Sequence, residues 1–264
     1  MICRKRQIIF LPRPVFIGGK LWYTETMKLS QRLRTVKELI PAGGVVADIG
    51  ADRGELSLAL LSEGIAEKVI LTDVSPRSLN RAKQLFADRD EAAKAEFRVG
   101  NGLFVLSPGE ADTAVFAGMG GLTIVDILTA APAVTAACSC LVIQAMGNSD
   151  KVRRCLGSLG FVLTDERMVE EEGQFYAILQ AVPGASRLDE TELFAGPFLL
   201  ARKDPVLRKW LRLERDKAEA IRKKLAEKNE GLPRRRALAE KIRRIDEAEK
   251  RMNTEINVKK EGNP

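Results

Sequence analysis

Residues 45–54 limit the folds open to this chain more than any other segment, because a short apolar run there contains a carboxylate and then turns through glycine. Residues 45–49 are rich in β-branched side chains, as in a strand buried on both faces of a parallel sheet. The leucines of residues 56–61 supply the apolar side of a helix that Gly64 is placed to end. A strand, a glycine turn and a helix in this order predict a nucleotide-binding crevice of an open α/β sheet.

The glycine turn itself points to a cationic ligand. Gly50 and Gly54 lack the spacing of the Gly-x-Gly-x-x-Gly dinucleotide fingerprint, since Asp52 occupies the second glycine position. A carboxylate there repels a pyrophosphate, which disfavours a Rossmann dehydrogenase. It suits S-adenosylmethionine, which carries an ammonium and a sulfonium. Considered alone, the segment is equally compatible with an ordinary strand-to-helix turn.

A second carboxylate follows a second apolar run, residues 69–73. Asp73 lies about twenty residues beyond the glycine turn, where nucleotide-binding α/β folds place the acid that binds ribose hydroxyls. A third strand is expected over residues 95–99, followed by Asn101 and Gly102. The amide of Asn101 can pair with an adenine edge, although asparagine is also a common turn residue.

Further strands are expected over residues 112–116, 138–145, 161–169 and 175–181. The glycine-rich run of residues 117–121 follows the first of these and allows a ligand to approach the backbone. The last two strands are joined by a short polar loop and therefore pair antiparallel. A doubly wound α/β sheet with this ending is the pattern of class I methyltransferases.

Composition excludes several kinds of chemistry. The chain of 264 residues contains no histidine, which removes histidine acid–base catalysis and histidine metal ligands. Its four cysteines form no Cys-x-x-Cys pair, so we expect no zinc site and reduced thiols in a cytoplasmic protein. The N-terminal apolar stretches are too short to cross a membrane.

Charge divides the chain into three parts. Residues 1–26 carry a net charge of +4 and residues 200–264 carry +9, so residues 27–199 carry −6. An acidic body with a basic tail suggests a polyanionic partner held by the tail. A solvated helix face is the alternative explanation for such a charge run.

These features divide the chain into domains. We expect residues 1–26 to be a disordered or non-native extension, residues 27–183 a catalytic domain that binds S-adenosylmethionine, residues 184–203 a linker, and residues 204–255 an antiparallel helical hairpin. The hairpin prediction rests on apolar residues at near-heptad spacing, Leu207, Leu211, Ala218, Ile221 and Leu225, and on a similar set after Gly231 and Pro233. A coiled coil used for packing or dimerisation competes with an arm that binds a polyanion.

Five motifs in this order carry a family resemblance. They occupy residues 29–33 (Leu-Ser-x-Arg-Leu), 47–52 (Ala-Asp-Ile-Gly-Ala-Asp), 100–103 (Gly-Asn-Gly-Leu), 117–121 (Ala-Gly-Met-Gly-Gly) and 194–197 (Phe-Ala-Gly-Pro). With the helical tail, the chain resembles the TrmK family of bacterial tRNA (adenine(22)-N(1))-methyltransferases over residues 28–250. Two positions depart from the family pattern: Arg53 stands where histidine is usual, and Asn101 where an acid is common.

The resemblance implies a Rossmann-like sheet, a coiled-coil domain and direct in-line methyl transfer to an adenine in tRNA, by a monomer or a weak homodimer. Together with the residue patterns it gives the expected cofactor-binding residues: Asp48, Gly50, Ala51, Asp52, Asp73, Val74, Asn101, Gly102, Ala117, Gly118 and Met119. Asp52 and Met119 are expected closest to the reaction. The expected tRNA contacts are Arg32, Arg53, Arg222, Lys223, Lys224, Arg234, Arg235 and Arg236. A methyltransferase of another RNA or a small molecule, and a non-catalytic nucleotide- or RNA-binding scaffold, remain open alternatives.

Overall fold

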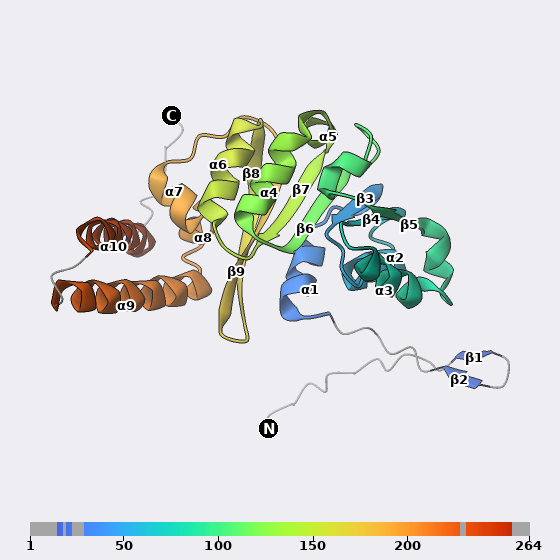
Figure 1. Ribbon diagram of the computed structural model, residues 1–264, viewed down its shortest axis with the longest axis horizontal. Coiled ribbons are helices and arrows are strands. Elements are labelled where there is room, and N and C mark those ends of the chain that lie inside the picture. Colours follow the sequence, from blue (N-terminus) through green and yellow to red (C-terminus); the bar gives the residue numbers. More distant parts are fainter. Residues whose placement is uncertain (1–14, 18–19, 23–28, 228–230, 255–264) are drawn as a thin grey trace, which may run out of the picture.

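The computed structural model describes residues 15–17, 20–22, 29–227 and 231–254. Their centre is a seven-stranded sheet of order β5-β4-β3-β6-β7-β9-β8 (Figure 1). Its strands are β3 (Val45–Ile49), β4 (Lys68–Asp73), β5 (Ala95–Val99), β6 (Thr113–Met119), β7 (Cys140–Ala145), β8 (Phe161–Glu171) and β9 (Gln174–Pro183). The first five pair in parallel, and β9 pairs antiparallel with both β7 and β8. The predicted class I methyltransferase sheet is thus confirmed.

Helices cover both faces of the sheet. One layer contains α1 (Gln31–Glu38), α2 (Glu55–Ser62) and α3 (Pro76–Phe86), and the other contains α4 (Gly121–Ala130), α5 (Pro132–Ala137) and α6 (Ser149–Ser158). Two 3-10 helices, η1 (Asp90–Lys94) and η2 (Gly102–Val105), flank β5. Side chains of β3 alternate between the layers: Val46 packs in the α1–α3 core, and Ala47 and Ile49 pack in the α4–α6 core.

Strand order reverses between β3 and β6, which both pair with parallel neighbours. Connections from β3 and β4 run to one side of the sheet and those from β6 and β7 to the other. The carboxyl ends of β3 and β6 therefore leave a crevice between diverging loops, where ligands of doubly wound folds bind.

The segment of residues 184–203 is not the linker that we expected. It contains α7 (Glu190–Ala195), which Asp189 and Glu192 begin with a reciprocal capping box, and α8 (Pro197–Ala201). Ala195 and Leu199 are buried in a third core with residues of the C-terminal hairpin. The capping box of Asp189 and Glu192 is a sequence signal for a helix start. The helices are too short, at 6 and 5 residues, to show a helical period in the sequence.

A buried ion pair attaches this segment to the sheet. Arg153 of α6 and Glu166 of β8 are 2.6 Å apart, with side chains 1% and 0% exposed. Arg153 also donates to the carbonyl of Leu193 at 2.8 Å, and Glu166 accepts from the backbone N–H of Phe198 at 3.2 Å. A buried pair is stable only when its remaining donors and acceptors are satisfied, and here α7 and α8 satisfy them.

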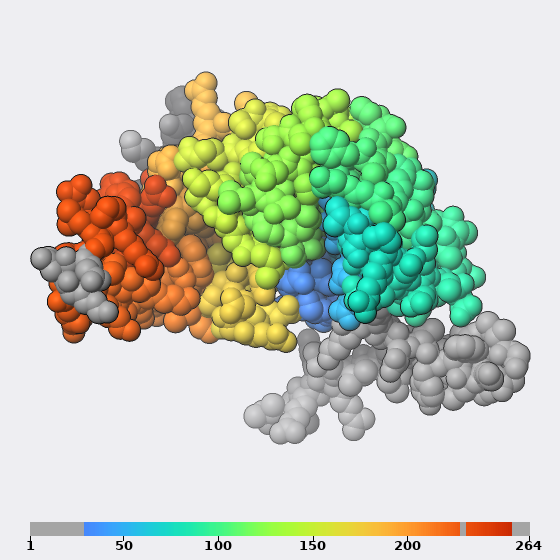
Figure 2. Space-filling view, in the orientation of Figure 1, coloured from blue at the N-terminus to red at the C-terminus, as the bar shows by residue number. Residues whose placement is uncertain are grey.

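The C-terminal hairpin consists of α9 (Pro205–Glu227) and α10 (Leu232–Asn253) and forms a lobe at one end of the molecule (Figures 1 and 2). Its base is apolar, with Leu207, Leu211 and Ile245 fully buried. Farther along, ion pairs join the helices, including Arg215 with Glu249 at 2.7 Å and Lys241 with Glu214. The hairpin orientation is therefore set by packing within one chain.

The expectation for residues 1–26 lies largely outside the described residues. Within that range, β1 (Val15–Ile17) and β2 (Lys20–Trp22) pair antiparallel. In the part of the chain that the structure describes, no helix combines the length and apolarity that crossing a bilayer requires.

Candidate active site

One pocket of about 270 Å³ opens at the carboxyl ends of β3 and β6. It brings together eight residues expected from the sequence, which are Arg32, Gly50, Ala51, Asp52, Arg53, Ala117, Gly118 and Met119, and adds Leu33, Glu55 and Leu56. The other expected cofactor residues are not part of this lining and lie on the same half of the sheet: Asp48 on β3, Asp73 and Val74 at the end of β4, and Asn101 and Gly102 after β5. The six expected contacts on α9 and α10 lie in the separate hairpin lobe.

Glycine is required where β3 turns into the pocket. Gly50 has φ +74°, and a Cβ there would lie 3.2 Å from the sulfur of Met119. Gly54 also has φ +74°, and its Cβ would lie 2.8 Å from a methyl carbon of Leu71. Both positions favour glycine through φ and through space, so the turn stays close to β6 and to the sheet. On β6, Gly118 has φ +86°, a backbone conformation that also favours glycine.

Asp48 is the buried carboxylate of the site. It is 3% exposed and accepts a hydrogen bond from the hydroxyl of Ser57 at 2.7 Å. Burial raises the pKa of Asp48 to about 6, the Ser57 hydrogen bond opposes this change, and the nearby charge of Asp73 adds to it. A positive group placed against this carboxylate would offset the cost of its burial, which suits the ammonium of a bound ligand.

We expect Asp48→Asn to stabilise the ligand-free protein at pH 8 while weakening cofactor binding. The raised pKa favours the folded state fully below pH 4, and that contribution is lost as pH rises through about 6. An amide removes this loss of folding free energy, which is on the order of 3 kcal/mol for a pKa raised from 3.8 to about 6. Urea unfolding at pH 4 and pH 8 measures the effect, with the exposed Asp88→Asn as control; an unchanged difference between the two pH values would contradict the assignment.

Asp73 is oriented by backbone donors. Its carboxylate accepts from the N–H of Ser75 at 2.8 Å and from the N–H of Asp52 at 3.2 Å. The second contact ties the end of β4 to the glycine turn after β3. Val74, beside it, is 67% exposed and offers an apolar surface to a flat ring.

The expected residues Asn101 and Gly102 follow β5, which pairs with the strand that ends at Asp73. The N–H of Gly100 donates to the carbonyl of Asp73 at 3.0 Å, and Asn101 follows with an exposed side chain. Gly102 has φ +57°, and a Cβ there would lie 2.6 Å from Ile127 of α4. The tight packing of Gly102 fixes the course of this loop along the edge of the crevice.

Asp52 lies at the pocket mouth with φ +45° and pairs with an arginine that we did not predict. Arg81 of α3 donates to its carboxylate at 2.5 Å and also to the hydroxyl of Ser78 at 3.3 Å. Arg53 lies 3.9 Å from Asp52 and 3.3 Å from Glu55. Sequence reasoning missed Arg81 because no local signal separates it from the other cations of α3.

Arg32 joins three further residues that sequence reasoning missed. It donates to the side-chain carbonyl of Gln144 at 2.5 Å, lies 3.9 Å from the carboxylate of Glu171, and stacks 5.6 Å from the ring centroid of Tyr176. A Cβ on Gly118 would lie 3.7 Å from the same guanidinium. Arg32 is thus part of the pocket wall, held from β7, β8 and β9.

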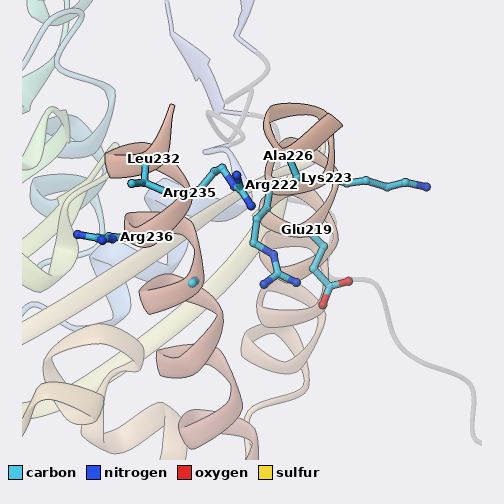
Figure 3. A pocket seen from close by; sticks show the side chains of 8 residues that line it. Glu219, Arg222, Lys223, Ala226, Leu232, Arg235 and Arg236 are labelled. Atoms are coloured by element: carbon cyan, nitrogen blue, oxygen red, sulfur yellow. The ribbon is translucent and has the colours of Figure 1, made fainter. Parts of the chain in front are cut away.

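The hairpin cations gather around a hollow between the ends of α9 and α10 (Figure 3). Arg222 and Arg235 extend into the space between the helices, whereas Lys223 points away from it. Arg236 also lines the hollow, and Lys224 and Arg234 are exposed on the same helix ends. Ile221 and Leu232 are 37% and 57% exposed, so the predicted apolar seam does not continue to this end.

The described residues contain no group of three or more His, Cys, Asp or Glu side chains arranged to hold a metal ion. Cys138 and Cys140 are buried, and burial raises the pKa of both thiols to about 11. Such thiols are poor nucleophiles at neutral pH. The charged side chains that line the pocket are those of Arg32, Asp52, Arg53 and Glu55.

Comparison with known proteins agrees with this geometry. Residues 29–179 match the model of a methyltransferase domain family. The chain is 35% identical over 191 residues to the tRNA (adenine(22)-N(1))-methyltransferase of Bacillus subtilis, which covers 70% of this chain and 80% of that protein.

Two solved structures resemble the whole described body. The Bacillus subtilis m1A22 tRNA methyltransferase TrmK superimposes with a TM-score of 0.77 at 29% identity, over 84% of this chain and 99% of that one. A putative tRNA (m1A22) methyltransferase from Streptococcus pneumoniae, in complex with S-adenosyl-L-methionine, gives 0.76 at 28% identity with the same coverage. The chain therefore belongs to the TrmK family of class I methyltransferases.

Proposed function

We propose that this protein transfers the methyl group of S-adenosylmethionine to N1 of adenine 22 in tRNA. The observation that carries the proposal is that Asp48 and Asp73 lie at the carboxyl ends of the neighbouring strands β3 and β4, on the same sheet as the glycine-lined pocket of β3 and β6. The Bacillus subtilis relative is named for this reaction, and the Streptococcus pneumoniae relative was solved with this methyl donor.

We assign each part of the methyl donor to residues in the pocket or on the neighbouring strands. Asp48 and the turn from Gly50 to Asp52 would hold the methionine end, where a buried carboxylate complements an ammonium. Asp73, whose carboxylate is oriented by the N–H of Ser75, would accept hydrogen bonds from ribose hydroxyls, and the exposed Val74 would pack on the adenine ring. Asn101 and Gly102 would border that ring. When bound, S-adenosylmethionine supplies an electrophilic methyl group on a sulfonium.

The methyl transfer to adenine N1 requires little acid–base catalysis by the protein. Adenine N1 carries an in-plane lone pair and is largely unprotonated at neutral pH, so no strong base is needed. Arg53 carries a guanidinium group, which is a hydrogen-bond donor without an acceptor site and does not serve as a base. Holding the two reactants in line contributes up to about 7–11 kcal/mol. Ala117, Gly118 and Met119 line the wall against which the extruded target base would lie.

We assign Asp52, which lines the pocket, to offset the positive charge that develops on the adenine ring. In the ligand-free protein its charge is shared with Arg81. Arg32 is held by Gln144 and Glu171 and shapes the pocket wall, so we assign it to positioning the target nucleotide.

Transfer RNA binding is assigned to the hairpin of residues 204–255, with S-adenosylmethionine in residues 27–183. The two helices carry sixteen Lys and Arg residues against eight Asp and Glu, a net charge of +8. Their apolar residues pack against α7 and α8 of the same chain, which supports a monomer over a dimer built on this seam. A tRNA substrate also supports a cytoplasmic location.

The direct test is incubation of the protein with an unmodified tRNA transcript and labelled S-adenosylmethionine, followed by nucleoside analysis. We expect 1-methyladenosine as the labelled product. A transcript with guanine at position 22 serves as the control and should remain unlabelled. Label in another nucleoside, or in ribosomal RNA alone, would contradict the proposal and favour a different methyltransferase specificity.

A further inference from the structure

A second pocket, which we call the junction pocket, lies where the sheet meets the hairpin. It has a volume of about 180 Å³ and draws its lining from β7, α6, β8, β9, α7, α9 and α10. The lining consists of Ala145, Gly147, Asn148, Ser149, Asp150, Arg153, Met168, Phe175, Ala177, Phe194, Ala195, Trp210 and Lys241. None of these residues lines the pocket at β3 and β6, so the molecule has two sites with separate walls.

Aromatic side chains dominate one side of the junction pocket. The rings of Phe194 and Trp210 are packed with centroids 5.4 Å apart and planes tilted by 41°. Phe175 comes from β9, with the ammonium of Lys209 6.0 Å from its ring centroid. Met168 completes the apolar surface. Several aromatic rings with a nearby cation are the usual platform for a nucleobase.

The opposite side of the junction pocket is polar. Asn148 adopts φ +55° directly before α6, and its side chain makes no capping hydrogen bond to that helix. Its amide thus presents a donor and an acceptor, which a nucleobase edge can use. The loop is held firmly, because a Cβ on Gly121 would lie 2.3 Å from the carbonyl oxygen of Gly147 and 3.0 Å from that of Asn148.

The junction pocket lies beside the proposed reaction site. The N–H of Met146 donates to the carbonyl of Met119 at 2.8 Å, so one backbone contact links the two pockets. On its other side, Asp150, Phe194 and Lys241 also border a hollow with Ala237, Glu240 and Arg244 of α10. The junction pocket thus adjoins both Met119 and α10, the two regions that we propose the RNA contacts.

We propose that the junction pocket receives a second unstacked nucleobase of the RNA substrate, one that neighbours the methylated adenine. This inference rests on the proposed function, because it takes the substrate to be RNA. The methylated base itself must reach Gly118 and Met119, which the junction pocket does not include. The second base stacks on Phe175 and Trp210 and pairs its edge with Asn148, so that it anchors the extruded strand.

Steady-state kinetics with Trp210→Leu, Trp210→Phe and Asn148→Gly tests the role in methyl transfer. Leucine at position 210 is apolar but lacks a flat ring on which a base can stack, whereas phenylalanine retains an aromatic ring. Glycine at position 148 tolerates the positive φ of that residue and removes the side-chain amide. We expect Trp210→Leu to raise KM for tRNA about 5- to 150-fold, with Trp210→Phe restoring most of it. Asn148→Gly should raise the same constant severalfold, and the affinity for S-adenosylmethionine should stay unchanged in all three.

A fall in kcat with an unchanged KM for tRNA would overturn the inference, because it would assign the pocket to the methylated base or to packing. Equal losses with leucine and phenylalanine would overturn it as well. Urea unfolding midpoints of the variants show whether Trp210→Leu remains folded; Asn148→Gly and Phe175→Leu provide the same kinetic test if it does not.

Tryptophan fluorescence tests occupancy without catalysis. The chain contains two tryptophans, Trp22 and Trp210, so Trp22→Phe leaves Trp210 as the single reporter. Saturation with unmodified tRNA should quench its emission, and duplex RNA of equal length should not. If the emission of Trp210 stays unchanged at tRNA concentrations at which a filter assay shows the tRNA to be bound, the proposed base-binding role of the junction pocket is wrong. Absence of methylated product with wild-type protein would instead refute the proposed function, while the fluorescence result would stand independently.

Discussion

Replacement of Asp73 by alanine is expected to lower S-adenosylmethionine affinity by a factor on the order of 10² to 10⁴. Two ribose hydrogen bonds to a charged acceptor contribute about 1.5–3 kcal/mol each. The substitution also removes the acceptor for the N–H of Asp52, which is 3.2 Å from the carboxylate. The glycine turn would then lose its tie to β4, so both the ribose contact and the methionine contact should weaken.

Isothermal titration calorimetry with the purified protein measures this effect. The matched control is Asp112→Asn, since Asp112 also accepts a backbone N–H, that of Val45 at 2.8 Å, but at the amino-terminal edge of the same sheet. Asp112→Asn should leave the affinity unchanged. If Asp73→Ala binds S-adenosylmethionine with near wild-type affinity, Asp73 does not bind the ribose, and the proposed role of the strand-end carboxylates is wrong.

Neutralising the hairpin end should weaken tRNA binding on the order of 10²-fold at low salt while sparing the cofactor. The variant replaces Arg222, Lys223, Arg235 and Arg236 with glutamine, which removes four cations from the ends of α9 and α10 around the hollow. Loss of about four phosphate contacts also predicts a slope of log affinity against log salt that is smaller by about three. Filter binding over a salt series measures both quantities.

The control for this prediction removes the same number of charges from the far end of the sheet. This control variant replaces two cations of α3, one that precedes η1 and one in η1, namely Arg77, Lys83, Arg89 and Lys94. In Figure 1, α3 lies near β5, at the end of the molecule opposite the hairpin. Replacement of these cations with glutamine should alter the salt slope by less than one. Equal slopes for the two quadruple variants would show that the protein responds to net charge alone, and would end the assignment of tRNA to the hairpin.

The strands and their terminal carboxylates could be predicted from local sequence. Residues 45–49 match β3, a mostly buried strand, because an apolar run bounded by glycine fits the interior of a parallel sheet. Residues 95–99 match β5, a half-exposed strand at the edge of the sheet. Asp48 and Asp73 could be assigned to one crevice from topology, since parallel strand ends meet at one edge. The hairpin followed from near-heptad spacing, although only its base has the predicted apolar packing.

The tertiary structure decided which side chains act together. Arg32 and Gln144 are separated by 112 residues, and Arg81 and Asp52 by 29, so neither pair leaves a signal in local periodicity. The pKa of Asp48 depends on how completely the surrounding layers exclude water. The junction pocket combines residues from seven elements. Hydrophobic pattern and turn chemistry are properties of neighbouring residues, whereas burial, ion pairing and cavities arise only when distant segments pack together.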